Sequence, residues 1–247
     1  MADHRRQKSA CPGFLNPVTI PAMKRVAMFS LVGCLIFASR GAAVSAEAEH
    51  DFGKWEKAIA AYEQTDRTNR PPKGALLFIG SSTIRLWKTL AQDFPGQRVI
   101  NRGFGGSEIV DSSHFAERII FPYTPRMVFL RAGGNDLWGG KPPEQVFAEF
   151  KEFVQKVHAK LPDTEIVFVS LSPSIARWKQ ADKEKTLNAL VKDYISGKPR
   201  LKYLETYDMV LGADGQPRAG LFIEDKLHFN AAGYELLAGR VRPFLPK

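Results

Sequence analysis

The chain has 247 residues, 44% of them hydrophobic, with 20 Gly and 16 Pro spread along its length. This composition is typical of a globular protein, and the length suits one domain of roughly 200 residues plus an extra segment. The formal net charge is +9, but no basic run with interleaved aromatic residues accompanies it, so a nucleic-acid partner is not expected.

The extra segment lies at the N-terminus and has the features of a secretory signal. Lys24 and Arg25 precede a run of 13 apolar residues, VAMFSLVGCLIFA (26–38), and the following residues end at Ala46 in a small-x-small pattern. A basic start, an apolar run and small residues before a cleavage point are typical of exported proteins. The run is well short of the roughly 20 residues that a membrane-spanning helix needs. We therefore expect cleavage after Ala46 and a periplasmic or secreted product.

Two features of this segment leave open where the chain starts and whether it carries a lipid. Met23 starts a more ordinary signal than the residues before it, so we expect Met23 to be the true initiator. The sequence LVGC resembles a bacterial lipobox, which would place a lipid anchor on Cys34. We favour simple cleavage, because only 11 residues separate Met23 from Cys34 and the apolar run continues through Phe37. The mature chain would then lack both Cys11 and Cys34 and would carry a formal net charge of +4.

From residue 47 onward, the pattern alternates between helices and strands. Residues 51–72 predict an N-terminal helix that occupies the segment 47–73, with Trp55, Ile59 and Tyr62 on one face. Apolar strands alternating with amphipathic helices indicate a parallel sheet covered on both faces, which is an α/β domain over 74–247. Strands are predicted at 75–79, 98–101, 127–131, 165–172 and 201–204, and helices from 82, over 108–120, from 142, over 182–195 and after Asn230.

Polar groups gather where the predicted strands end, which is where such folds place their working residues. The first strand ends at GSS (80–82), the second runs into NRGFGGSE (101–108), and the third runs into RAGGNDLW (131–138). Near the C-terminus, Asp225 stands three residues before His228. Acyl transfer needs a nucleophile, a base, an acid that orients the base, and donors for the developing oxyanion. Each of these four requirements has a candidate in the segments above.

The candidates differ in how directly the sequence indicates them. A serine at a strand-to-helix turn is exposed, and its own N–H points into the site. Gly106 offers a backbone N–H at a place where substrate can approach closely, and Asn135 offers a side-chain amide. His228 is the only one of the five histidines that enters a helix from a loop beside an acid, Asp225. This position favours His228 as the base.

Together these segments resemble the SGNH hydrolases (the GDSL-type esterase and lipase superfamily), in particular the bacterial branch similar to platelet-activating-factor acetylhydrolase. The resemblance covers residues 74–247 and implies a three-layer α/β/α sandwich with a flavodoxin-like parallel sheet of about five strands. It implies Ser82 as nucleophile, with Asp225 and His228 as orienting acid and base. It also implies that Gly106 and Asn135 join the Ser82 N–H in the oxyanion hole, and it implies no cofactor.

One position departs from the family pattern. Ser81 stands where the usual GDS motif has aspartate, which leaves Ser81 and Ser82 as rivals for the nucleophile. Position in the turn favours Ser82. The missing aspartate is not part of the triad, so its absence should not abolish the chemistry.

Simpler explanations exist for each motif on its own. GSST is typical of a helix cap and GGND of a turn. The pair Asp225 and His228 could hold a metal, but no further His or Cys cluster accompanies it, so no metal is expected. Trp138 and Arg177, with Arg131, are candidates for binding substrate, although core packing or structural ion pairs would also explain them. The four segments in order nevertheless favour a catalytic site.

The sequence therefore predicts an exported serine esterase that hydrolyses short-chain esters, acetyl above all, carried on small molecules or glycans. The short loops after the strands contain no apolar flap that could cover a long acyl chain. One alternative is a lysophospholipase or thioesterase of the same superfamily. Another is a non-catalytic glycan-binding protein with the same fold. The pattern does not indicate an oligomeric state.

Overall fold

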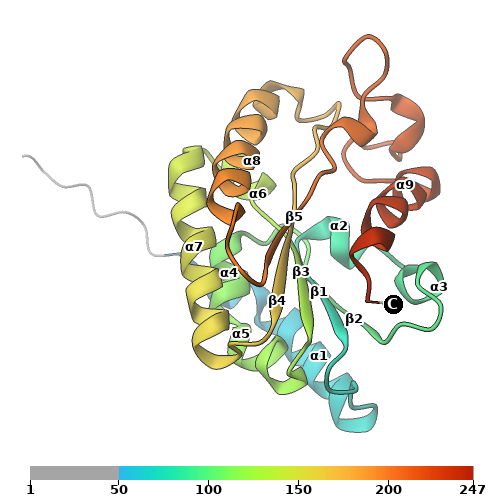
Figure 1. The fold of residues 1–247 in the computed structure, drawn as a ribbon. Helices are drawn as coiled ribbons and strands as arrows, with labels where there is room; N and C mark the ends of the chain where they lie inside the picture. The colour runs from blue at the N-terminus through green and yellow to red at the C-terminus, as the bar shows by residue number, and fades with distance from the viewer. Residues whose placement is uncertain (1–49, 247) are drawn as a thin grey trace, which may run out of the picture. The chain divides into compact units, whose positions relative to one another are not determined.

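Five strands form one parallel sheet in the computed structural model, which describes residues 50–246 (Figure 1). The predicted signal segment, including Met23, Cys34 and Ala46, lies outside the described residues. The strand order β2-β1-β3-β4-β5 is that of flavodoxin-like folds, so the predicted architecture is confirmed. The strands are β1 (Leu76–Gly80), β2 (Val99–Gly103), β3 (Met127–Arg131), β4 (Glu165–Val169) and β5 (Leu201–Leu204).

Helices pack on both faces of this sheet and complete three layers (Figure 1). One layer consists of α1 (Glu56–Thr68), α4 (Ile109–His114), α5 (Ala116–Ile119), α7 (Pro143–Lys160) and α8 (Ala181–Ile195). The opposite layer consists of α2 (Ser82–Arg85), α3 (Leu90–Asp93) and α9 (Ala231–Val241). A further short helix, α6 (Gly134–Trp138), directly follows β3.

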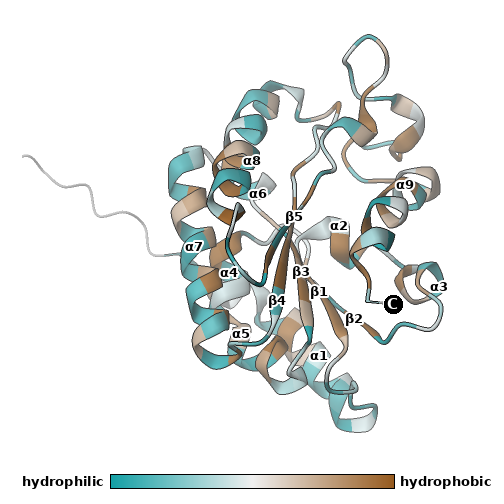
Figure 2. Cartoon of the chain, viewed as in Figure 1, coloured by the Kyte–Doolittle hydropathy of each residue, from teal (hydrophilic) through white to brown (hydrophobic). Residues whose placement is uncertain are grey.

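The strands alternate between the two cores that these layers create. On β1, Leu77 and Ile79 pack with the α7 layer, whereas Leu76 and Phe78 pack with the α9 layer, and all four are fully buried. Side chains of a strand point alternately to opposite faces, so a strand covered on both faces must be apolar at every position. Figure 2 shows this as largely brown strands beside helices such as α7, whose turns are mainly teal.

Two helices differ from the sequence-based expectation. The helix predicted over 108–120 is interrupted at Phe115, where the chain leaves helical geometry between α4 and α5. The interruption lets the Phe115 ring, 2% exposed, pack edge-on against Phe104 at 6.1 Å between ring centroids. The GGND segment is also more than a turn, because Gly134 begins the helix α6.

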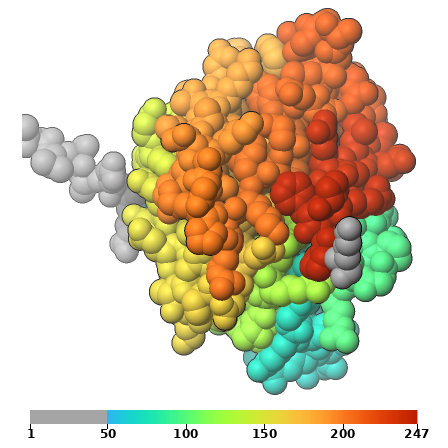
Figure 3. Space-filling view, viewed as in Figure 1, coloured from blue at the N-terminus to red at the C-terminus, as the bar shows by residue number. Residues whose placement is uncertain are grey.

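The C-terminal part of the chain lies beside the carboxyl ends of the strands, where Phe222, His228 and Phe229 line the same cavity as Ser82. Figure 3 shows it in orange and red, covering much of one face beside the yellow α7. Within residues 50–246, no helix is both long and apolar enough to cross a membrane.

Candidate active site

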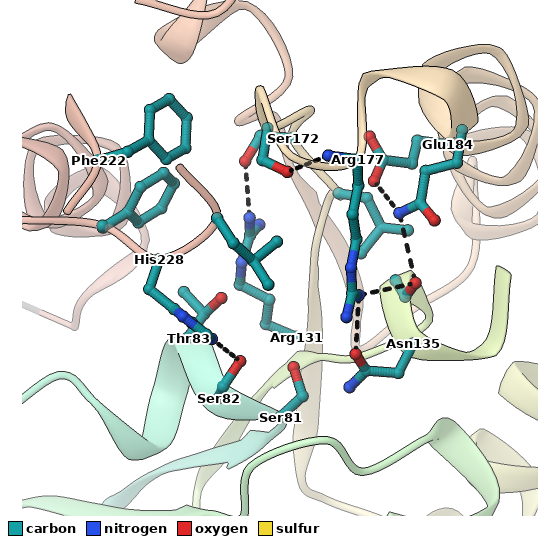
Figure 4. A pocket seen from close by; sticks show the side chains of 16 residues that line it. Ser81, Ser82, Thr83, Arg131, Asn135, Ser172, Arg177, Glu184, Phe222 and His228 are labelled. Atoms are coloured by element: carbon teal, nitrogen blue, oxygen red, sulfur yellow. Dashed lines mark hydrogen bonds between the residues drawn. The ribbon is translucent and has the colours of Figure 1, made fainter. Parts of the chain in front are cut away.

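The turn between β1 and α2 carries the serine pair. Gly80 has a φ of +125°, and a Cβ placed there would lie 2.1 Å from the Arg131 carbonyl oxygen, so only glycine fits between the two strand ends. Ser81 occupies the N-cap position of α2 without a side-chain capping bond, and its N–H donates to the Arg131 carbonyl. Ser82 is the first residue of α2. This turn directs the side chains of Ser81 and Ser82 toward the same cavity (Figure 4).

A compact loop before α9 holds the histidine. Phe222 and Phe229 pair as an antiparallel bridge, and the Ile223 N–H donates to the His228 carbonyl at 2.9 Å. Asn230 caps α9 by accepting from the Gly233 N–H at 3.2 Å, at the position after which the sequence predicts the last helix. These local bonds fix the loop and the start of α9, and thereby the position of the imidazole.

The structure brings Ser82, His228 and Asp225 together in one hydrogen-bonded chain. His228 Nε2 lies 2.9 Å from Ser82 Oγ, and His228 Nδ1 lies 2.5 Å from Asp225 Oδ2 (Figure 4 shows the first contact). Asp225 Oδ1 also accepts the backbone N–H groups of Leu227 and His228, each at 2.9 Å. No hydrogen bond links Ser81 Oγ to this chain of described side chains.

Asp225 is held in its ionised form by these donors. Partial burial acts to raise its pKa, but hydrogen bonds from the His228 N–H, the His228 ring and the Leu227 N–H outweigh it and lower the pKa to about 2. An ionised acceptor at Nδ1 fixes the ring tautomer with its proton on Nδ1, which leaves Nε2 free to accept the Ser82 proton.

Asn135 lies across the cavity from His228 on α6 (Figure 4). Its Nδ2 donates to the Ser107 carbonyl at 2.9 Å, which ties α6 to the loop after β2. Gly106 lies in that loop with a φ of +80°, and a Cβ there would lie 3.1 Å from the Trp55 ring. Gly106 is not among the residues that line the cavity, so the structure places its loop beside Asn135 without showing its N–H at Ser82.

The two arginines proposed from sequence both line the cavity, but neither forms an ion pair with a carboxylate of the described chain. Arg131 is buried and donates to the Ser170 carbonyl and to Ser172 Oγ, the latter at 2.6 Å. Burial lowers its pKa to about 10, so it stays charged near neutrality. Arg177 contacts Asn135 instead, and its guanidinium lies 5.0 Å from the Trp138 ring centroid.

The cavity beside Ser82 is small and mostly polar, with a volume of about 70 Å³. Ligand pockets for drug-sized molecules are roughly 300–1,000 Å³, so this space suits a small group rather than a long chain. Glu184 is buried at the cavity wall, accepts from Gln180 at 2.7 Å and has a pKa raised by burial to about 7. The side chains that line it are Ser81, Ser82, Thr83, Arg131, Asn135, Leu171, Ser172, Ser174, Arg177, Gln180, Glu184, Phe222, Leu227, His228 and Phe229.

Two tryptophans close in sequence to the serine and asparagine segments, Trp138 and Trp87, are not among the residues that line the cavity. Trp138 is 54% exposed and does not line the cavity, although it follows Asn135 by three residues. Trp87 is 2% exposed and packs between Phe78 and Phe94, so core packing accounts for it.

Sequence reasoning missed a partly buried charged cluster that includes Asp136, the residue after Asn135. Lys141 Nζ lies 2.8 Å from Glu108 and 2.7 Å from Glu149, with Asp136 at 4.0 Å. Asp136 also accepts the Ile109 N–H at 3.1 Å, which joins α6 to α4. Burial, reinforced by the neighbouring carboxylates, raises the pKa of Asp136 to about 7. In the sequence, only the acidic residues Glu108 and Asp136, which end the NRGFGGSE and GGND segments, indicated charge near this place.

No group of three or more His, Cys, Asp or Glu side chains is arranged to hold a metal ion within residues 50–246.

Comparisons with known proteins agree on the kind of enzyme. The family model described as the GDSL-like lipase/acylhydrolase family matches residues 80–236. The curated platelet-activating factor acetylhydrolase IB subunit alpha1 of Bos taurus is 25% identical over 193 residues, which cover 74% of this chain and 78% of the relative.

Solved structures show the same fold. A protein from Streptococcus pneumoniae aligns with a TM-score of 0.71 at 21% identity over 78% of this chain and 94% of its own. A GDSL-like lipase from Bacteroides thetaiotaomicron aligns with a TM-score of 0.62 at 18% identity, over 78% and 96%. An acetyl-xylooligosaccharide esterase from Geobacillus stearothermophilus, in a mutant form, aligns with a TM-score of 0.57 at 17% identity, over 72% and 97%.

Proposed function

This chain belongs to the GDSL-like lipase/acylhydrolase family of SGNH hydrolases, and from that premise we propose that it is an exported serine esterase that removes short acyl groups, acetyl above all, from sugars. Membership makes it a carboxylic ester hydrolase. The observation that carries the proposal is the hydrogen-bonded chain from Ser82 through His228 to Asp225 at the wall of a small polar cavity.

The geometry supports a two-step acyl transfer. His228 Nε2 takes the proton from Ser82 Oγ as that oxygen bonds to the ester carbonyl carbon. The resulting oxyanion accepts hydrogen bonds from Asn135 Nδ2 and from the N–H groups of Ser82 and Gly106. The tetrahedral intermediate then expels the alcohol oxygen, which takes the proton from His228. A water molecule, deprotonated by the same imidazole, attacks the acyl-enzyme and releases the acid and free Ser82.

Cavity size and lining favour a short acyl group. Each buried CH₂ contributes roughly 0.8 kcal/mol to binding, but only where an apolar surface is present to cover it. The space beside Ser82 is about 70 Å³, and polar side chains predominate in its wall. A long chain would therefore gain little there.

A sugar as the carrier of the ester is supported by two observations. Trp138, 54% exposed, offers an open aromatic ring on the same short helix as Asn135. The acetyl-xylooligosaccharide esterase that shares this fold shows that the fold can host an esterase of acetylated oligosaccharides. Export rests on the signal-like N-terminal segment alone, and we expect the mature protein to begin at Glu47.

A substrate series tests the proposal. Hydrolysis of aryl esters from acetate to palmitate should give the highest kcat/KM at acetate or propionate, and acetylated oligosaccharides should release acetate. Ser82→Ala serves as the inactive control. A maximum at about eight carbons or longer would contradict the short acyl group and favour the lysophospholipase alternative. Absence of any ester hydrolysis would favour the glycan-binding alternative.

A further inference from the structure

Arg177 makes a contact that the esterase mechanism above does not use. It lies in the loop that follows β4, and its Nη1 donates to Asn135 Oδ1 at 2.9 Å and to the Gly134 carbonyl at 3.5 Å. Figure 4 shows the guanidinium reaching down to the Asn135 amide from above the cavity. A residue 42 positions away in sequence thus holds the carbonyl end of the amide proposed to bind the oxyanion.

This contact decides which way the Asn135 amide points. With Oδ1 facing the Arg177 guanidinium, Nδ2 must face the Ser107 carbonyl, 2.9 Å away. A flipped amide would set an NH₂ group against a cation and an oxygen against a carbonyl oxygen, and both contacts would be repulsive. Nδ2 carries two hydrogens, and Ser107 uses one of them. The second hydrogen remains available for the oxyanion.

The same contact also strengthens Nδ2 as a donor. A hydrogen bond from a cation to a carbonyl-type oxygen draws electron density through the conjugated amide toward that oxygen. The amide nitrogen then carries more positive charge on its hydrogens. Arg177 is half-buried, and the Glu184 carboxylate interacts with it only through space, without an ion pair. The side-chain hydrogen bonds of Arg177 go to the oxygens of Gly134 and Asn135, so the guanidinium acts directly on the amide.

We propose that Arg177 is a positioning residue that orients and polarises the Asn135 amide as an oxyanion donor; the inference rests on the proposed esterase function. Such a residue acts only when charge develops on the carbonyl oxygen. Its removal should therefore lower kcat and leave KM nearly unchanged. A residue that gripped the substrate itself would change KM.

A double-mutant cycle tests the proposal. Arg177→Met, Asn135→Ala and the double variant are compared with wild type in kcat and KM for 4-nitrophenyl acetate. Asn135→Ala should lower kcat by about 10²–10³. Arg177→Met should lower it by about 10–100-fold, as expected for one hydrogen bond to a charged group. In the Asn135→Ala background, Arg177→Met should cost little more, because the group through which it acts is gone.

Three further variants sharpen the outcome. Arg177→Lys restores a charged donor and should recover part of the lost kcat. If Arg177→Met does not fold, Arg177→Gln, which also removes the charge, takes its place in the cycle. Lys179→Met removes an exposed charge two residues away and should leave kcat unchanged, which separates the contact from a general charge effect. Ser82→Ala sets the background rate.

Different results would contradict the positioning role of Arg177 and the esterase function. Losses that multiply fully in the double variant, or an effect on KM alone, would overturn the positioning role while wild-type activity upholds the esterase. A wild-type protein that does not hydrolyse 4-nitrophenyl acetate would overturn both.

Discussion

The two sides of the cavity are built in opposite ways. On the Ser82 side, Asp225 and His228 are three residues apart, and their side chains are 42% and 22% exposed, although the contact between His228 and Ser82 spans 146 positions. On the opposite side, Asn135 is held by hydrogen bonds with Ser107 and Arg177, which are 28 and 42 positions away. The next residue, Asp136, is a fully buried carboxylate. Substitutions of Asp225 and His228 should therefore lower catalysis with little effect on folding. Substitutions in the charged cluster of Lys141 and Asp136 should lower stability.

The largest expected effect belongs to Ser82, the proposed nucleophile. Ser82→Ala should lower kcat by on the order of 10⁶, since triad members act as a unit. Ser81→Ala should keep most of the activity, because Ser81 Oγ has no hydrogen bond to the imidazole. Steady-state kinetics with 4-nitrophenyl acetate measures both. An inactive Ser81→Ala beside an active Ser82→Ala would reverse the assignment.

Asp225, the proposed orienting acid, has the next largest expected effect. Asp225→Asn should lower kcat by about 10⁴, because an amide donor favours the wrong imidazole tautomer. Its melting temperature should fall only slightly, since the side chain whose hydrogen bonds are weakened is 42% exposed and its contacts are local. Thermal unfolding together with kinetics tests the comparison. A large drop in melting temperature would show that this side is also structurally essential.

The sequence predicted the contacts between residues close in the chain better than the contacts between distant residues. Asp225, His228 and the cap Asn230 lie within six residues, so a motif contains their whole geometry. The β1 turn is likewise local, and it correctly placed Ser82 at the start of a helix. The contact between Arg177 and Asn135 depends instead on how the loop after β4 folds over α6, and no spacing encodes that.

The buried charges could not be predicted for the same reason. Lys141 meets Glu108 and Glu149 only once α4, α6 and α7 have packed together. The interruption at Phe115 is a further tertiary effect, because helix propensity alone continues through that residue.

Lys141→Met tests the buried side directly. It leaves Glu108 and Glu149 without their common cation. Because the side chains of Lys141 and Glu108 are each 20% exposed, we expect a loss of about 1–2 kcal/mol in the free energy of unfolding, less than for a fully buried ion pair. Lys183→Met on the exposed face of α8 is the matched control and should be nearly neutral. Urea unfolding of both variants measures the difference. Equal stabilities would mean that the cluster does not stabilise the fold.

The smallest expected effect is a pH dependence. The folded-state pKa of Asp136, about 7, lies above its ordinary value of 3.8, so the folded protein holds this proton more tightly. The corresponding stability is present below about pH 4 and is lost as the pH rises through 7. Wild type should therefore lose more unfolding free energy between pH 5 and 8 than Asp136→Asn, which cannot ionise.

Asp225→Asn provides the contrasting control. The folded-state pKa of Asp225 is lowered to about 2, so its contribution is present above 3.8 and is lost only as the pH falls through 2. Between pH 5 and 8 Asp225 is ionised in both the folded and the unfolded protein, so its own ionisation adds no pH dependence to the stability over that range. Urea unfolding at the two pH values decides the matter, and parallel behaviour of the two variants would contradict the contrast between the two sides.

Chemical labelling tests the central claim most directly, namely that Ser82 is the nucleophile of an esterase. A fluorophosphonate reacts with a serine activated by a histidine base, and mass spectrometry of the digested protein locates the modified residue. We predict one phosphonyl group, on Ser82, and its loss in His228→Ala. A label on Ser81, or wild-type protein that stays unlabelled, would contradict the account.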